Sequence, residues 1–151
     1  MDESERIIRE VLKLLPEITK ALSRTVPEHA RQRGVSMAQV KTLVHLAQYG
    51  PQTMGELAAG LRITTPSATG LVGPLVDAGY LVRQRDVDDR RVVEVRLSEQ
   101  AQEFADQILA VRRAQVEDAL AGMDLEARAH FLEGLSRLAA AVESRDKEQT
   151  G

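Results

Sequence analysis

Two short helical segments separated by three residues, and followed by two extended segments, occupy residues 53–98. Thr53 and Glu56 have the spacing of a capping box, in which each side chain accepts a hydrogen bond from the other residue's backbone N–H. The turn 62–64 follows. Pro66 stands at the start of the second helix, where the N–H that proline lacks would have no partner within the helix. We therefore expect one helix to end near residue 61 and the next to end at residues 77–79.

The two extended segments cover residues 81–85 and 91–97, and the charged loop 86–90 joins them. This loop is too short and too charged to be anything but the tip of a hairpin. A helix pair followed by a hairpin with a basic tip predicts a winged helix-turn-helix. Such a shape fits a major groove of DNA together with the adjacent minor groove.

Long amphipathic helices are predicted on both sides of this region, over residues 4–24 and 99–145. Apolar residues recur there at helical spacing, with Ser98 and Asp124 placed to cap two successive helices in the second stretch. Pro16 is expected to kink the first helix, and residues 25–35 read as a connector. The predicted fold is mainly α with a small β-hairpin wing. We expect one domain over residues 1–151, with the winged helix-turn-helix in residues 36–97.

The long flanking helices carry more apolar surface than one small winged domain needs to bury. Burial against a second copy predicts a two-fold homodimer, so these would be dimerisation helices. Two recognition helices would then read half-sites about 34 Å apart on double-stranded DNA. An intramolecular three-helix bundle without a dimer is the alternative.

Composition excludes several other classes of function. The chain has no cysteine, so disulfides, thiolate metal sites and a cysteine redox switch are ruled out. The three histidines, His29, His45 and His130, lack the spacing of metal ligands, and we expect no metal and no cofactor. No nucleophile–base pair, phosphate loop or carboxylate pair stands out, so an enzyme is not expected. No membrane span is expected, because no apolar run approaches the length of a bilayer span, and we expect a cytoplasmic protein.

The charge distribution has the sign expected for a DNA-binding surface. The whole chain has a net charge of −3, whereas residues 62–97 hold six arginines and five acidic residues. An acidic body repels DNA except where the basic groups point.

Residues 89–98 match the most specific motif of the MarR family of bacterial transcriptional regulators. The family pattern is Asp-x-Arg-x-x-x-Leu/Val-x-Leu-Thr/Ser, and it is filled here by Asp89, Arg91, Val95, Leu97 and Ser98. The order of predicted helices is also similar to that of the family, over nearly the whole chain. The family glycine three residues after this motif is Ala101 here. The chain thus resembles a MarR regulator.

The resemblance implies that Arg91 enters the minor groove and that Asp89 pairs with it and fixes its direction. A guanidinium in a narrow minor groove meets concentrated negative potential, which supports this role. A solvated hairpin turn whose charges only prevent aggregation is the alternative. Gly70 and Pro74 stand where family members often carry arginines, so the recognition helix has an unusually neutral surface. Pro74 is also expected to kink this helix or end it early.

Groove contacts are therefore expected from hydroxyl groups, backbone N–H groups and the wing. The candidate DNA-binding residues are Thr64, Thr65, Ser67, Thr69, Arg83, Arg85, Asp89, Arg90 and Arg91. Thr65 is expected to cap the helix, while Ser67 and Thr69 serve either as DNA contacts or only as helix-start residues. His45 and Tyr49 lie four residues apart and would line a pocket or pack in the core.

The resemblance also implies a small aromatic or phenolic effector, for which the sequence identifies no binding residue. The predicted function is a sequence-specific, ligand-responsive transcriptional repressor that binds a pseudo-palindromic operator as a homodimer. The alternative is a winged-helix protein-interaction module with weak or lost DNA binding.

Overall fold

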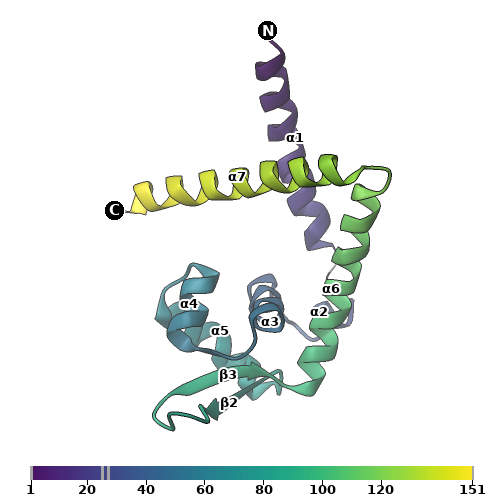
Figure 1. Cartoon of the computed structure of the whole chain (residues 1–151). Helices are drawn as coiled ribbons and strands as arrows, with labels where there is room; N and C mark the ends of the chain where they lie inside the picture. Colours follow the sequence, from purple (N-terminus) through teal and green to yellow (C-terminus); the bar gives the residue numbers. More distant parts are fainter. Residues whose placement is uncertain (1, 25, 27, 151) are drawn as a thin grey trace. The chain divides into compact units, whose positions relative to one another are not determined.

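The structure is a computed structural model, and it describes residues 2–24, 26 and 28–150 (Figure 1). The described chain divides into two compact units, Met1–Arg112 and Arg113–Gly151. The helices are α1 (Glu3–Ser23), α2 (Glu28–Gln32), α3 (Met37–Tyr49), α4 (Met54–Leu61), α5 (Thr65–Asp77), α6 (Glu99–Leu120) and α7 (Leu125–Thr150). The strands are β1 (Gln52–Thr53), β2 (Leu81–Arg85) and β3 (Val93–Leu97). The prediction of one domain over residues 1–151 stays a prediction.

The helices begin where the sequence places capping residues. Ser36 and Gln39 form a capping box at the start of α3, with Gln39 N–H donating to Ser36 Oγ over 3.2 Å. Thr53 and Glu56 form the same arrangement at the start of α4. Each box satisfies two of the backbone N–H groups that a helix start leaves without partners. These local signals therefore set the boundaries of the helix-turn-helix, as predicted.

Three strands form one antiparallel sheet in the order β1-β3-β2. The hairpin pairs Leu81 with Leu97 and Arg85 with Val93, and β1 pairs Gln52 with Val95 on the other edge of β3. The sequence pattern predicts only the two strands of the hairpin, so β1 is a correction to that prediction. The second hairpin strand also begins at Val93 instead of residue 91, because residues 86–92 form the loop. Figure 1 shows β2 and β3 projecting as a wing beside α3, α4 and α5.

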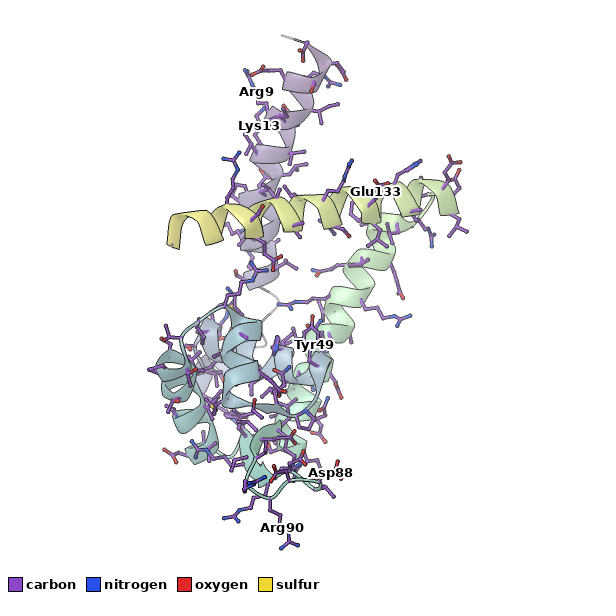
Figure 2. The ribbon with its side chains drawn as sticks, turned by 60° about the vertical axis from the view of Figure 1, so that its left-hand side comes forward. Arg9, Lys13, Tyr49, Asp88, Arg90 and Glu133 are labelled. Atoms are coloured by element: carbon purple, nitrogen blue, oxygen red, sulfur yellow. The ribbon has the colours of Figure 1, made fainter. Side chains whose placement is uncertain are left out.

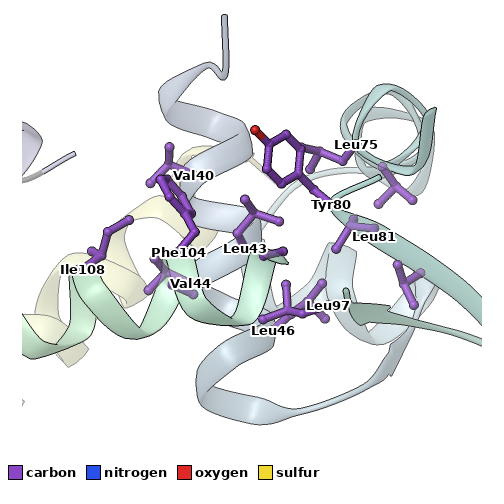
Figure 3. Packing of buried hydrophobic residues seen from close by; sticks show 14 of the residues in the cluster. Val40, Leu43, Val44, Leu46, Leu75, Tyr80, Leu81, Leu97, Phe104 and Ile108 are labelled. Atoms are coloured by element: carbon purple, nitrogen blue, oxygen red, sulfur yellow. The ribbon is translucent and has the colours of Figure 1, made fainter. Parts of the chain in front are cut away.

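The hydrophobic core lies in the first unit, between the helices and the sheet (Figure 3). Its most buried large side chains, each at most 2 % exposed, are Val40, Leu43, Leu46, Leu57, Val72, Leu75, Leu81, Val95 and Ile108. Complete burial of one such side chain contributes about 1.5–3 kcal/mol. Phe104 and Ile108 bring the first half of α6 into this core, while α4 contributes Leu57 and α5 contributes Val72. The two helices of the helix-turn-helix are thus anchored on one shared core.

Two expectations about helices need correction. The connector expected over 25–35 contains the short helix α2, although Thr25 and Pro27 lie outside the described residues. Pro74 does not end α5, which continues to Asp77 and contains the proline. Proline removes one backbone donor, and the buried residues Val72 and Leu75 on either side hold the helix against the core.

The long helices at the two ends of the chain carry exposed apolar side chains. The structure gives α1 no buried residue, and α7 likewise has none among its described side chains. Leu12 is 63 % exposed in α1, and Leu132 is 64 % exposed in α7. No helix in the described part of the chain has the length and apolar character that crossing a membrane requires.

Candidate nucleic-acid interface

The turn between α4 and α5 is closed by backbone hydrogen bonds. Ile63 N–H donates to Ala58 O over 3.0 Å, and Arg62 N–H donates to Ala59 O over 3.2 Å. Arg62 has φ 55° and ψ 46°, which is the left-handed conformation. Thr64 follows in an extended conformation and caps α5. The sequence places the turn correctly at residues 62–64, but it gives no direct sign of the left-handed arginine.

The hydroxyl groups at the start of α5 are held by local hydrogen bonds. Thr64 Oγ1 accepts a bond from Ser67 N–H over 3.2 Å and donates to Ser67 Oγ over 2.8 Å. Thr69 Oγ1 donates to Thr65 O over 3.0 Å. The helix cap is therefore Thr64, and the expectation that Thr65 is the cap is wrong. Adjacent threonines have the same local preference, so the sequence alone does not separate them.

All four of these hydroxyl residues, Thr64, Thr65, Ser67 and Thr69, are exposed. A hydroxyl group has one donor and two acceptor positions, so a local hydrogen bond leaves capacity for a further partner. The local bonds also fix the orientation of the Thr64 and Ser67 side chains before any partner arrives. This arrangement can contact phosphates and base edges, although each hydroxyl discriminates less than a bidentate arginine.

The surface of α5 that faces away from the core carries small, uncharged side chains along most of its length. Ala68, Val72 and Leu75 form the buried face. Gly70 and Gly73 lie on the opposite face, and a Cβ atom built at either glycine meets nothing within 4 Å. Neither glycine is therefore required by packing within the chain, and both leave the helix backbone open to close approach by a partner.

The tip of the wing is a closed loop ordered by Asp86. Its Oδ1 accepts hydrogen bonds from Asp88 N–H over 2.7 Å and from Asp89 N–H over 2.9 Å. The backbone closes the loop through Asp86 N–H to Val92 O and Val92 N–H to Asp89 O, both over 2.9 Å. Asp86 thus has a structural role, because aspartate readily accepts bonds from backbone N–H groups in turns.

Asp89 holds Arg91 by three hydrogen bonds. Arg91 Nε and Nη2 donate to the two carboxylate oxygens of Asp89 over 3.2 and 3.3 Å, and Arg91 N–H donates to Oδ1 over 3.0 Å. The Arg91 side chain bonds, followed by the Arg91 backbone N–H, hold the pKa of the Asp89 carboxyl below its usual value. The pairing predicted from the family resemblance is confirmed. The Arg91 side chain is nevertheless 92 % exposed, so its outer surface is accessible to a partner.

The other predicted arginines lie along the same wing. Arg83 pairs with Val95 across the hairpin, and Arg85 pairs with Val93. The two arginines therefore lie on the same face of the sheet as Leu81, which is closer to the core. Arg90 lies in the tip loop, and Figure 2 shows its side chain projecting outward from the wing. The structure thus groups the predicted residues into two sets, one at the start of α5 and one on the wing.

His45 and Tyr49 contact each other at the end of α3. Their ring centroids are 4.6 Å apart, and His45 Nε2 lies 2.9 Å from Gln52 Oε1. His45 is half-buried and bound within the fold, whereas Tyr49 is 67 % exposed. The side chain of His29 lies outside the described residues. Among the residues that are described, no group of three or more His, Asp or Glu side chains could hold a metal ion.

Known proteins resemble this chain in sequence and in fold. Residues 35–93 match the model of the MarR family. The uncharacterized HTH-type transcriptional regulator YfiV of Bacillus subtilis is 29 % identical over 114 residues, which cover 76 % of this chain and 71 % of YfiV. These matched regions contain the helix-turn-helix described above.

Two solved structures show the same fold. A MarR family protein from Bacillus stearothermophilus is 25 % identical with a TM-score of 0.68, covering 95 % of this chain and 99 % of that one. FabT of Streptococcus pneumoniae, solved in complex with DNA, is 22 % identical with a TM-score of 0.72, covering 94 % of this chain and 99 % of FabT. The match of residues 35–93 and these likenesses thus identify a MarR-type winged helix-turn-helix in this chain, with the paired Asp89 and Arg91 on its wing.

Proposed function

We propose that this chain is a ligand-responsive transcriptional repressor that binds a pseudo-palindromic operator as a homodimer. The observation that carries the proposal is the bidentate bond between Arg91 and Asp89 at the tip of the wing. A guanidinium that is oriented before binding loses less rotamer freedom when it enters a minor groove. The narrow minor groove of A·T-rich DNA attracts such a group most strongly.

The start of α5 supplies the second part of the proposed contact. Thr64, Thr65, Ser67 and Thr69 present exposed hydroxyl groups there. The first backbone N–H groups of a helix also attract phosphate, because they lack partners within the helix. In this proposal α5 docks in the major groove, while Arg83, Arg85, Arg90 and Arg91 bind along the wing. Asp89 acts by positioning Arg91.

Exposed apolar side chains support the proposed homodimer. In α1 they are Ile7, Ile8, Val11, Leu12, Leu14, Ile18 and Leu22, and in α7 they are Leu125, Phe131, Leu132, Leu135 and Val142. Monomeric soluble proteins seldom expose such sets of large apolar residues. A second copy would cover these residues by two-fold symmetry and would place two α5 helices for two half-sites.

Repression and response to an effector complete the proposal. A dimer bound across a promoter excludes other proteins from the same DNA. A small aromatic or phenolic effector that binds one arrangement of the two winged regions better than another would shift the dimer away from DNA. The effector remains a class of compound in this proposal, and no residue is assigned to it.

The test is a binding selection with the purified chain on random double-stranded DNA, followed by a salt series on the selected sequence. We expect enrichment of a pseudo-palindrome and a steep loss of affinity with salt, because each neutralised phosphate releases counterions. Multi-angle light scattering should give twice the chain mass. Absence of specific binding even at low salt would favour the alternative, a winged-helix protein-interaction module.

A further inference from the structure

Val87 is the most exposed of the large apolar side chains that the structure describes, at 92 %. It lies in the loop at the tip of the wing and is the one uncharged residue in the sequence 85–91. Asp86 closes the turn with its own carboxylate, and such a turn places little demand on the side chain that follows. Neither packing within the chain nor the turn therefore requires a valine here.

The register of the hairpin places Val87 across the loop from Arg91. Beyond the last pair of the β2–β3 ladder, Asp86 N–H donates to Val92 O over 2.9 Å. Val87 and Arg91 are thus the next residues on the two arms of the loop. A groove that admits Arg91 at the tip of the wing therefore meets Val87 at the same place.

The loop that carries Val87 is ordered before any partner arrives. Asp86 Oδ1 accepts hydrogen bonds from the N–H groups of Asp88 and Asp89, and Asp89 in turn binds the Arg91 side chain. Valine has few rotamers because it is branched at Cβ. An apolar group that is held in this way gives up little conformational freedom on binding. The wing tip thus presents two methyl groups beside an oriented guanidinium.

The minor groove of DNA distinguishes its base pairs chiefly by one group. A·T and T·A pairs show only acceptors there, whereas a G·C pair adds the N2 amino group of guanine as a donor. A methyl group cannot accept a hydrogen bond from this amino group and removes the water that would. An apolar side chain in the groove therefore disfavours G·C pairs and tolerates A·T pairs.

We propose that Val87 enters the minor groove beside Arg91 and excludes guanine from the base pairs under the wing tip. This inference rests on the proposed DNA-binding function and adds to it a residue that determines specificity. Arg91 supplies the charge that a narrow groove attracts, and Val87 penalises the amino group that a G·C pair places there. The wing thereby adds sequence preference to an interface whose recognition helix, α5, has no Lys or Arg.

The first test measures binding of the wild-type chain to variants of the operator obtained by selection. Each A·T pair is replaced in turn by G·C and by inosine·cytosine, which shows the major-groove pattern of G·C but lacks the N2 amino group. We expect pairs in each half-site at which G·C weakens binding about tenfold and inosine·cytosine restores most of the affinity. Equal losses with both replacements at every pair would place the discrimination in the major groove and overturn the inference.

The second test changes the side chain. Val87→Thr keeps the shape of valine but replaces one methyl group with a hydroxyl, which can accept a hydrogen bond from the amino group. We expect this variant to lose most of the preference against G·C, and Val87→Leu to keep it. Val82→Thr makes the same exchange on β2, away from the tip, and serves as the matched control that keeps the preference.

Two further readings separate specificity from charge and from folding. The slope of log affinity against log salt should equal that of wild type in all these variants, because none changes a charge. Val87→Thr should also unfold at the wild-type temperature, since the side chain is exposed. Undiminished preference against G·C in Val87→Thr would overturn this inference alone. Failure of the wild-type chain to bind any DNA would overturn the proposed function together with it.

Discussion

The ring of His45 in α3 lies against Gly60 in α4. A Cβ atom added at Gly60 would stand 2.5 Å from both Cε1 and Nε2 of the ring, well inside van der Waals contact. The same Nε2 atom lies 2.9 Å from Gln52 Oε1 in β1, so the ring is held between two helices and the edge of the sheet. The glycine therefore allows α3 and α4 to approach each other closely at the base of the helix-turn-helix.

Gly60→Ala is expected to destabilise the protein by about 1–2 kcal/mol, measured as the free energy of unfolding in urea. Alanine improves helix propensity by about 1 kcal/mol, but the methyl group displaces the His45 ring and breaks its bond to Gln52. The clash should outweigh the gain in propensity because the ring has contacts on both sides.

A double-mutant cycle with His45→Ala tests the cause of this effect. Without the ring, the methyl group at residue 60 loses its three nearest contacts, and Gly60→Ala should then stabilise the chain by about 0.5–1 kcal/mol. The same sign of effect in both backgrounds would show that the His45 ring does not require the glycine.

Arg91→Ala is expected to weaken operator binding by about 1–3 kcal/mol with little change in the free energy of unfolding, because its ion pair with Asp89 is exposed. The side chain is 92 % exposed, so its loss leaves the core intact. Arg91→Lys should lose nearly as much affinity, because a lysine cannot form the two parallel hydrogen bonds to Asp89 that the guanidinium forms. Fluorescence anisotropy on the selected operator measures both, with Arg137→Gln as the control for charge. Wild-type affinity in Arg91→Ala would remove the wing from the proposed contact.

The Asp89 carboxyl should titrate below its usual pKa of 3.8, because the Arg91 side chain and backbone N–H bind its ionised form. A carboxyl whose folded-state pKa is lowered adds stability above the unfolded-state value, and this contribution is lost as the pH falls through the lowered pKa. The order of the wing tip should therefore be independent of pH near neutrality and decrease only in acid.

Carbon-13 NMR of the Asp89 side-chain carbonyl measures this pKa directly. In Arg91→Ala the pKa should rise toward 3.8 but stay below it, since the backbone N–H of residue 91 still donates to Oδ1. An Asp89 pKa that is unaffected by Arg91→Ala would mean that the pair is not formed in solution.

The local parts of the fold could be predicted from the sequence, and the parts that depend on distant contacts could not. The capping box at Thr53 and the strand 81–85 depend on neighbouring residues, and the structure confirms them. The strand β1 exists because Gln52 and Thr53 pair with β3, more than 40 residues away in sequence. No pattern over two residues signals such a pairing.

The same distinction applies to the candidate site. The motif at residues 89–98 identified the wing, and the family resemblance implied the pairing of Asp89 with Arg91, which the structure shows. The left-handed conformation of Arg62 was missed because arginine is not typical of that conformation. A glycine at that position would have been read as a helix end, as Gly79 was. The arginine instead becomes informative only when its φ angle is known.

Leu132→Glu is expected to convert the proposed dimer to a monomer. Leu132 is 64 % exposed in α7, and a charge at a position covered by a second copy would be buried without a partner. Multi-angle light scattering at micromolar concentration measures the mass. Val87→Glu, on the wing at 92 % exposure, makes the same kind of change outside the long helices and should leave the mass unchanged. A Leu132→Glu protein with the wild-type mass would exclude this part of α7 from the interface.

Gly70 offers a test of the neutral recognition helix. Its side of α5 is exposed, and a Cβ atom there meets nothing within 4 Å, so Gly70→Ala should raise the free energy of unfolding by about 0.4–1 kcal/mol. Gly70→Arg places a cation on a helix that has no Lys or Arg of its own, and its backbone effect should be similar.

DNA binding by the two variants then shows how closely α5 approaches the duplex. Gly70→Arg should bind random-sequence DNA more tightly than wild type, with a salt slope steeper by about 0.9 for each copy, because the new guanidinium meets a phosphate. Gly70→Ala adds no charge and should leave that slope unchanged. If Gly70→Arg is as stable as expected but gains neither affinity nor slope, this face of α5 does not meet DNA, and the helix would have to be removed from the proposed interface.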